Sequence, residues 1–251
     1  MNSRTHMTKT NLFTLLIVGV LAVSLYAAIT HAVPEGPSLS KLSNSTKATT
    51  AAAAHTAQKG TINYVELAAI QQNNRWKAYA GNVTGSLVLQ DSDGYNIYDW
   101  TLSTSLTGNI YASRSNSVNW SGNLSCFNST SMIAEEATLQ FTPLSADSIN
   151  STFSSTNHSL FTVNLIPLFN CSTVYTFESN ARQTANQANN SFQEIIVQDS
   201  FLSPIYTTRV YQDHINYKGN GNISDFQMIL PDYGNLSNSA TVTYYFYVEL
   251  T

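Results

Sequence analysis

Charged side chains are scarce in this sequence. Lys, Arg, Asp and Glu make up 10% of its 251 residues, whereas about 25% is usual for a globular chain. The hydrophobic content of 43% excludes the apolar-poor composition of disordered chains. The 11 Lys and Arg residues are scattered and the net charge is −4, which excludes the basic patches that bind nucleic acid or anionic membrane surfaces.

The low charge also bears on how the protein surface interacts with its surroundings. Neutral hydroxyls and amides keep their hydrogen bonding at any pH, so the chain would tolerate an acidic surrounding. Alternatively, attached sugars replace surface charge as the solubilising groups, and we favour this second interpretation.

Recognisable catalytic motifs are missing as well. There is no Gly-x-Ser-x-Gly motif, and the five histidines lack zinc-ligand spacing. The run "DSDG", Asp91 to Gly94, starts like a calcium loop, but the later ligands are absent and Asp-Gly is typical of a hairpin turn. Glu135 and Glu136 are adjacent, so on a helix they point in different directions, and we interpret them as helix surface rather than a glycosidase pair. We predict no catalytic residue, no metal site and no cofactor.

The N-terminus carries an export segment. Arg4 and Lys9 precede an uncharged run from Asn11 to about Thr30, an arrangement that directs the following chain out of the cytoplasm. Small residues at the end of the run fit a cleaved signal peptide, whereas its length fits a membrane anchor formed by residues 11–32. Both interpretations of residues 1–32 stay open, and both predict an extracellular or cell-surface location.

A linker and a single domain are predicted to follow. Residues 33–60 are rich in Ser, Thr and Ala and almost free of large apolar residues, so they cannot offset their chain entropy by burial and form a flexible linker. Residues 61–251 show no internal repeat and are enough for one extracellular domain.

Only two cysteines are present, Cys126 and Cys171. In an exported chain the default is a disulfide between them. It would close a loop of about 45 residues and stabilise the fold by roughly 4 kcal/mol on the chain-entropy model. The alternative is a pair of buried free thiols.

N-glycosylation sequons are abundant. They begin at Asn44, Asn82, Asn119, Asn123, Asn128, Asn150, Asn157, Asn170, Asn189, Asn222 and Asn235. Chance alone would produce several in a chain so rich in Asn, Ser and Thr. Combined with the export segment, they predict a heavily glycosylated surface.

Alternation with period two dominates the chain from about Thr61. The C-terminal run "ATVTYYFYVELT" places Val242, Tyr244 and Phe246 on one face of a strand, with an aromatic second face. "SLVLQ" and "NIYDWTL" predict a hairpin, and the other candidate strands are "GNIYAS", "FTVNLI", "TVYTFE", "QEIIVQD", "IYTTRVY" and "DFQMIL". Short helices are expected at 132–139 and near Ser145. The pattern predicts an all-β, mainly antiparallel β-sandwich with one or two short helices, preceded by an N-terminal apolar helix and a flexible linker.

The stretch "RWKAYAGNVTGSLVLQDSDGYNIYDW", Arg75 to Trp100, combines a sequon, two strands and a turn. We interpret it as part of the sheet wall, with Val83, Leu87 and Leu89 packing inward. The stretch resembles a segment of exported, β-rich archaeal cell-surface proteins that have an N-terminal apolar helix and no assigned activity. The resemblance implies a cell-surface location and transfers no functional residue.

Three functions are compatible with these features. The first is a structural or adhesive surface glycoprotein, in contact with the membrane through its N-terminal helix if that helix is uncleaved. The second is a filament subunit, in which "TINYVELAAI", Thr61 to Ile70, leaves its own domain and fills a groove in the next copy; otherwise this run is the first strand or helix of its own domain. The third is a carbohydrate-binding module or a glycan-active hydrolase. Expected partners are copies of the chain or other surface proteins.

Overall fold

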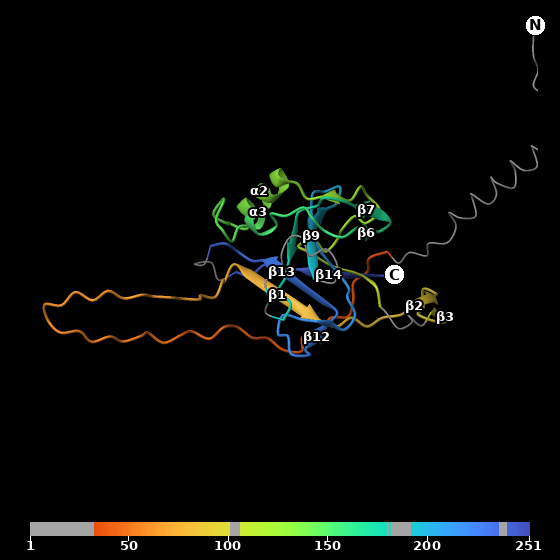
Figure 1. The fold of residues 1–251 in the computed structure, drawn as a ribbon. Helices are drawn as coiled ribbons and strands as arrows, with labels where there is room; N and C mark the ends of the chain where they lie inside the picture. Colours follow the sequence, from red (N-terminus) through yellow and green to blue (C-terminus); the bar gives the residue numbers. More distant parts are fainter. Residues whose placement is uncertain (1–32, 101–105, 180, 182–191, 236–239) are drawn as a thin grey trace, which may run out of the picture.

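The computed structural model describes residues 33–100, 106–179, 181, 192–235 and 240–251. Residues 1–32, on which the signal-peptide and anchor predictions rest, lie outside these ranges, and so does Asn189. The strands are β1 Trp76–Gly81, β2 Leu87–Gln90, β3 Asn96–Trp100, β4 Gly108–Ser113, β5 Ser125–Cys126, β6 Phe161–Val163, β7 Ile166–Leu168, β8 Thr173–Tyr175, β9 Gln193–Gln198, β10 Pro204–Arg209, β11 His214–Ile215, β12 Ile223–Ser224, β13 Phe226–Pro231 and β14 Tyr245–Leu250. The helices are α2 Ser129–Thr138 and α3 Ile149–Thr152 (Figure 1).

One six-stranded sheet organises the body. Its order is β14-β4-β10-β9-β5, and β8 also pairs with β9; every pairing is antiparallel. Tyr206 in the centre lies opposite Ala112 on one side and Ile196 on the other. β9 is buried along its whole length, as is typical of a strand whose two faces are both covered.

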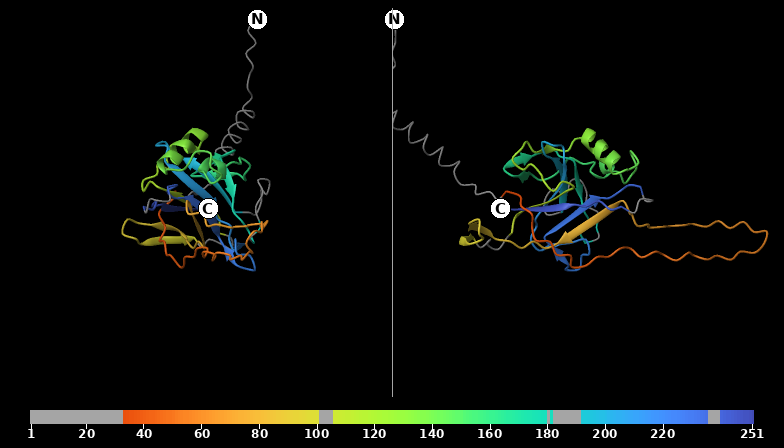
Figure 2. Two further views of the ribbon diagram at one scale, coloured as in Figure 1. Left: turned by 90° about the vertical axis from the view of Figure 1, so that its left-hand side faces the viewer. Right: turned by 180° about the vertical axis from the view of Figure 1, so that it is seen from behind.

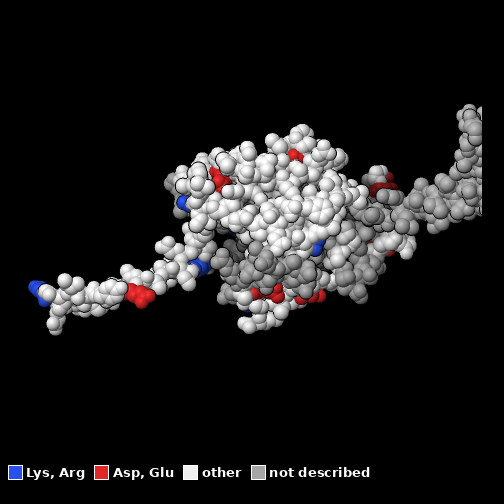
Figure 3. Space-filling model, turned by 45° about the horizontal axis from the view of Figure 1, so that its top comes forward, with Lys and Arg blue, Asp and Glu red and all other residues white. Residues whose placement is uncertain are grey.

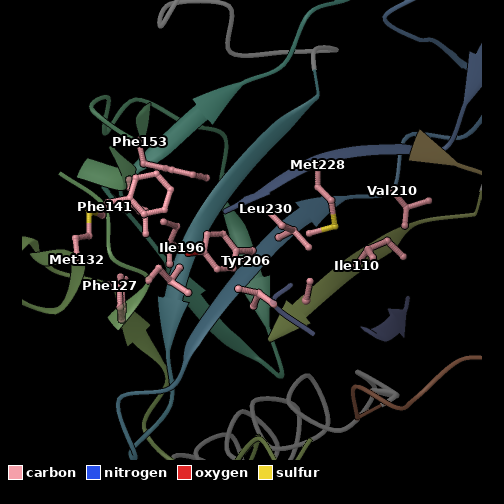
Figure 4. Close-up of a cluster of buried hydrophobic side chains, with 14 residues drawn as sticks. Ile110, Phe127, Met132, Phe141, Phe153, Ile196, Tyr206, Val210, Met228 and Leu230 are labelled. Carbon is pink, nitrogen blue, oxygen red and sulfur yellow. The ribbon is translucent and has the colours of Figure 1, made fainter. Parts of the chain in front are cut away.

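The larger hydrophobic cluster lies on one face of this sheet. The two-stranded β1–β13 sheet and the helices α2 and α3 cover it (Figure 4). Trp76 of β1 packs between Phe141 and Phe153, with ring centroids 6.0 and 6.3 Å away. Tyr79 packs edge-on against Phe246 of β14 at 5.0 Å. The aromatic side chains therefore hold the small sheet onto the edge of the large one.

A second cluster covers the opposite face. The β6–β7 hairpin and the loop that carries Trp120 pack against Tyr111, Ile195 and Ile205. Trp120 lies 4.9 Å from the Tyr111 ring and 5.2 Å from the Tyr247 ring. The C-terminal strand β14 thus has packed side chains on both faces, rather than the one predicted.

The predicted class is confirmed in its coarse form: the described residues are mostly strands in antiparallel sheets, with two short helices. Instead of two comparable sheets, one large sheet carries smaller elements on both faces. The run "FTVNLI" also differs from the prediction, since Asn164 and Leu165 have positive φ angles of 44° and 71°. These two residues form a tight turn, so the run becomes the β6–β7 hairpin.

The helices begin at different residues from those expected. The Asn128 side chain accepts the Ser131 N–H and caps α2, which begins at Ser129, three residues before the predicted start. The Ser148 side chain, not that of Ser145, accepts the Ser151 N–H and caps α3.

The prediction that Glu135 and Glu136 lie on the helix surface is wrong, because both are buried. Glu135 pairs with Arg114 through two hydrogen bonds, one of them 2.8 Å long. Glu136 accepts the N–H of Asn150 at the start of α3. The carboxylates face the body because each has a fixed donor there, which adjacency in sequence cannot reveal.

The prediction that Arg75–Trp100 forms a wall holds for β1 but not for the hairpin β2–β3. The hairpin pairs only with itself, and Leu89, predicted to pack inward, is exposed. Its turn forms as expected: Asp91 accepts the N–H groups of Asp93 and Tyr95, and Gly94 takes a φ of +90°. The β2–β3 hairpin, predicted to lie in the sheet wall, instead projects from the body (Figure 1).

Candidate self-association site

A long arm leaves the body and returns to it. We use the name "arm" for residues 36–72, which connect the chain beside β14 to the start of β1. Figures 1 and 2 show it as two extended legs that project from one end of the body. Every arm residue is exposed, and the hydrogen bonds of the arm are local, such as the one that closes a turn between Gln58 and Thr61. The arm therefore begins within the predicted linker but extends twelve residues into the predicted domain.

Within the arm, Thr61–Ile70 carries large apolar side chains, and we call it the donor segment. Ile62 and Tyr64 are 101% exposed, Leu67 is 87% exposed and Ile70 is 83% exposed. The segment forms neither a strand nor a helix of the described body. The interpretation as the first element of its own domain is therefore wrong, since the first strand begins at Trp76.

The outer edge of β14 is open over part of its length. Its inner edge pairs with β4. On the outer edge, Val248 exchanges two hydrogen bonds with Glu35, at 3.0 and 2.8 Å. Alternate residues of a strand direct their N–H and C=O groups to the same side. Phe246 thus presents its backbone groups outward, and Tyr244, just before β14, has the same parity. No hydrogen bond to the backbone groups of either residue occurs within the described part of the chain.

A groove lies along this open edge. It has a volume of about 350 Å³ and is lined by Gly36, Pro37, Leu39, Asn116 and the run Tyr244–Tyr247. The chain leaves β14 at this point because Pro37, two residues after Glu35, has no N–H to donate to the next ladder position. The groove therefore lies between the segment that starts at Gly36 and the unpaired outer edge of β14.

The β2–β3 hairpin exposes a second apolar surface. Tyr98 is 58% exposed and Trp100 is 49% exposed, with their ring centroids 4.8 Å apart. Leu89, Tyr95 and Ile97 add to this surface. In Figure 1 the hairpin lies at the end of the body opposite to the arm. These aromatic side chains do not belong to either of the two hydrophobic clusters of the body.

The predicted disulfide is present. Cys126 on β5 is bonded to Cys171, with a Cα–Cα distance of 4.9 Å and a sequence separation of 45. β5 and β8, the strand that follows Cys171, both pair with the same edge of β9. The bond therefore joins two short elements that have few other contacts with each other.

The sequons lie at accessible positions. Eight of the asparagines are exposed, namely Asn44, Asn82, Asn123, Asn128, Asn157, Asn170, Asn222 and Asn235, while Asn119 and Asn150 are half-buried. Asn119 donates its Nδ2–H to Ser200 at 3.0 Å, so a glycan there would have to replace this hydrogen bond. No described sequon is buried, and their occupancy stays a prediction.

Buried ionisable groups are present, but they are enclosed in the core. Glu194 accepts the N–H of Ile229 at 2.8 Å with one carboxylate oxygen, and its other oxygen has no partner. Burial raises the pKa of Glu194 well above its ordinary value, and the hydrogen bond from Ile229 only partly opposes this shift. Burial also raises the pKa of the neighbouring Tyr206 well above the ordinary value. No groove among those described exposes these groups, so the pair offers no substrate site.

The described ranges lack a metal-binding cluster and a membrane-spanning helix. They contain no group of three or more His, Cys, Asp or Glu side chains placed to hold a metal ion. None of their helices is long and apolar enough to cross a membrane. Charge is sparse on the face in Figure 3, as the composition predicts.

Comparison with known proteins gives no relative for this chain. No family model matches it, and neither a curated protein nor a solved structure is significantly similar. The resemblance of Arg75–Trp100 to archaeal surface proteins and the cell-surface location thus stay predictions. The function must be inferred from the geometry.

Proposed function

We propose that this protein is an exported structural subunit of the cell surface that assembles with copies of itself by β-strand addition. The donor segment of one copy supplies the added strand. The observation that carries the proposal is the high exposure of Ile62, Tyr64, Leu67 and Ile70 on a segment that forms no strand or helix of the described body. The export segment, the sequons and the disulfide support an extracellular setting.

Energetics favour a partner for the donor segment. Burying one large aliphatic or aromatic side chain stabilises a structure by about 1.5–3 kcal/mol. Contiguous apolar surface exposed on a soluble protein marks an interaction site more often than an accident. Four such side chains lie within ten residues, and these ten residues contain no proline or glycine. The segment therefore has both the side chains and the unbroken backbone donors that an added strand needs.

The length of the arm suits exchange between molecules. Its 37 residues are anchored at Glu35 by the pairing with Val248 and, at the other end, by the ion pair of Arg75 with Asp147. An extended leg of half that length reaches roughly 60 Å. Because both ends are fixed on the body, the donor segment can leave without unfolding the domain, and each copy remains folded before assembly.

The test compares two replacements within the arm. In the first variant, residues 61–70 become a Gly/Ser sequence of the same length. In the matched control, residues 45–54, which lie in the arm but contain no large apolar side chain, are replaced in the same way. Particle mass is measured by sedimentation, and native surface extracts are viewed by negative-stain imaging and by gel electrophoresis with and without boiling in detergent.

We expect multimers or threads for the unchanged chain and for the control, and monomers for the 61–70 replacement. A boiling-sensitive ladder should accompany the multimers, since the joining strands are not covalent. A strictly monomeric unchanged protein, or multimers that survive the 61–70 replacement, would contradict the proposal.

The β2–β3 hairpin supports a second candidate, an adhesive role for the same surface protein. The exposed, adjacent rings of Tyr98 and Trp100, whose planes are tilted by 58°, are suited to contact with sugar rings or with apolar protein surface. The double variant Tyr98→Ala/Trp100→Ala should lose binding to a glycan array or to cells, while Tyr95→Ala serves as a single-ring control. Retention of binding by the double variant would exclude the hairpin.

A further inference from the structure

We infer that the acceptor for the donor segment is the outer edge of β14 in a second copy of this chain, at Tyr244–Tyr247. This inference rests on the proposed function and adds the position of the joint. It begins with the backbone groups of Phe246 in β14 and of Tyr244 just before the strand, which have no hydrogen-bond partner in the described structure. An added strand would satisfy them in the way that β4 satisfies the inner edge.

The chain itself keeps this edge open. Glu35 occupies one ladder position opposite Val248. The next position would belong to Pro37, which cannot donate a hydrogen bond and is confined to strand edges and ends. The chain's own N-terminal segment therefore pairs with β14 through a single bridge, Glu35 to Val248. The groove of about 350 Å³ begins where this segment leaves β14. Exposed strand edges are usually blocked in monomeric proteins.

Two other edges of the body, those of β1 and β5, are poorer acceptors. The outer side of β1 presents Ala78 and Ala80, which are exposed small side chains, so little apolar surface would be buried there. β5 has only two residues, too few for a stable ladder. At β14, by contrast, the groove is lined by four consecutive aromatic residues, Tyr244–Tyr247.

The donor segment matches the two faces of the acceptor. On one face of β14, Phe246 belongs to the layer that contains Tyr79; on the other, Tyr247 packs against Trp120. A strand beside β14 would therefore meet apolar surface on both faces, and such strands have apolar residues at both parities. In the donor segment, Ile62 and Tyr64 occupy one parity, and Val65 and Leu67 the other. Because its apolar residues occur at both parities, the donor segment differs from a strand that has one face in solvent.

The donor segment is also tethered to its own β14, so pairing within one chain is the competing arrangement. Cysteine crosslinking separates the two. Both native cysteines are consumed by the disulfide, so an introduced cysteine is the only free thiol. One set of variants carries a single cysteine at each position from Ile62 to Leu67. The acceptor variant is Tyr245→Cys, and the control is Ala78→Cys on β1; both replace exposed side chains.

Equal amounts of one donor variant and one acceptor variant are mixed, allowed to assemble, and treated with a short bismaleimide. We expect a covalent dimer with Tyr245→Cys at a yield about tenfold above that with Ala78→Cys, because strand addition fixes the two thiols at high effective concentration. Along the donor positions, the yield should alternate with period two, since successive side chains of a strand point to opposite faces. Non-specific hydrophobic contact of the arm would give no alternation of the yield.

Three other outcomes would overturn the inference. Multimers that crosslink at Ala78→Cys, or at neither site, would place the joint elsewhere while the proposed self-assembly still holds. A double variant with Asn63→Cys and Tyr245→Cys that crosslinks only within one chain would show that the arm folds back on its own body. Absence of multimers in every mixture would remove the proposed function and the inference together.

Discussion

The arm and the central strand β9 contain similar residues in different surroundings. β9, "QEIIVQ", is buried at every position, whereas "TINYVELAAI" in the arm is exposed at every position. Both contain β-branched residues, which favour strands. β9 has strands on both sides to pair with, and the donor segment has none in the described chain. A strand-like sequence pattern therefore predicts that a segment pairs with another strand, but not whether that strand belongs to the same chain.

The largest expected effect comes from truncating one aromatic residue in the buried core and one in the arm. Phe153→Ala removes a fully buried ring from the larger cluster and should lower the free energy of unfolding by about 3–5 kcal/mol. Tyr64→Ala in the arm should change it by less than about 0.5 kcal/mol. Denaturant unfolding of the dispersed protein measures both. A loss of several kcal/mol for Tyr64→Ala would mean that the arm packs on its own body.

The disulfide gives the next effect. The double variant Cys126→Ser/Cys171→Ser should lose about 2–4 kcal/mol of unfolding free energy, since a loop of this length is no longer constrained in the unfolded chain. Thermal unfolding with and without a reductant provides the same comparison on the unchanged sequence. Assembly through the arm should persist under reducing conditions as long as the body stays folded, because the bond lies on the far edge of the sheet from β14. Selective loss of assembly from a folded, reduced body would contradict that separation.

A smaller effect, graded with pH, is expected from Glu194. Burial raises its folded-state pKa above the ordinary value of 4.5, so the folded state holds a proton that the unfolded state releases. Stability from this group is full below the unfolded pKa and falls as pH rises toward the folded pKa, by up to about 1.4 kcal/mol per pH unit. Glu194→Gln should flatten this slope. Unfolding curves from pH 4 upward test it, and an unchanged slope in the variant would show that another group is responsible.

Local signals in the sequence predicted local structure well. Asp91 and Gly94 predicted the β2–β3 turn, and the alternation in "GNIYAS" and "QEIIVQD" predicted β4 and β9. The cysteine count predicted the disulfide. Errors arose where the answer depends on distant residues. Glu135 and Glu136 are buried because Arg114 and the α3 backbone supply donors, and neither is a neighbour in sequence.

The candidate site divides in the same way. The donor segment could be predicted from the sequence, because ten apolar-rich residues follow a linker-like stretch and end before β1. The acceptor edge could not, since β14 reads as an ordinary terminal strand and nothing in its residues tells how many neighbours it has. Only the pairing of Glu35 with Val248 and the departure of the chain at Pro37 identify an unpaired edge.

The sequence by itself determined the low charge, the strand-rich class, the cysteine pair and the segments rich in apolar side chains, because these follow from composition and from short-range periodicity. The tertiary structure decided which of those segments are covered. Sheet order and the packing of both faces depend on contacts between residues far apart in the chain, and such contacts leave β9 enclosed and the donor segment exposed. Burial is a property of the assembled fold, so the difference between a core strand and a free strand appears only there.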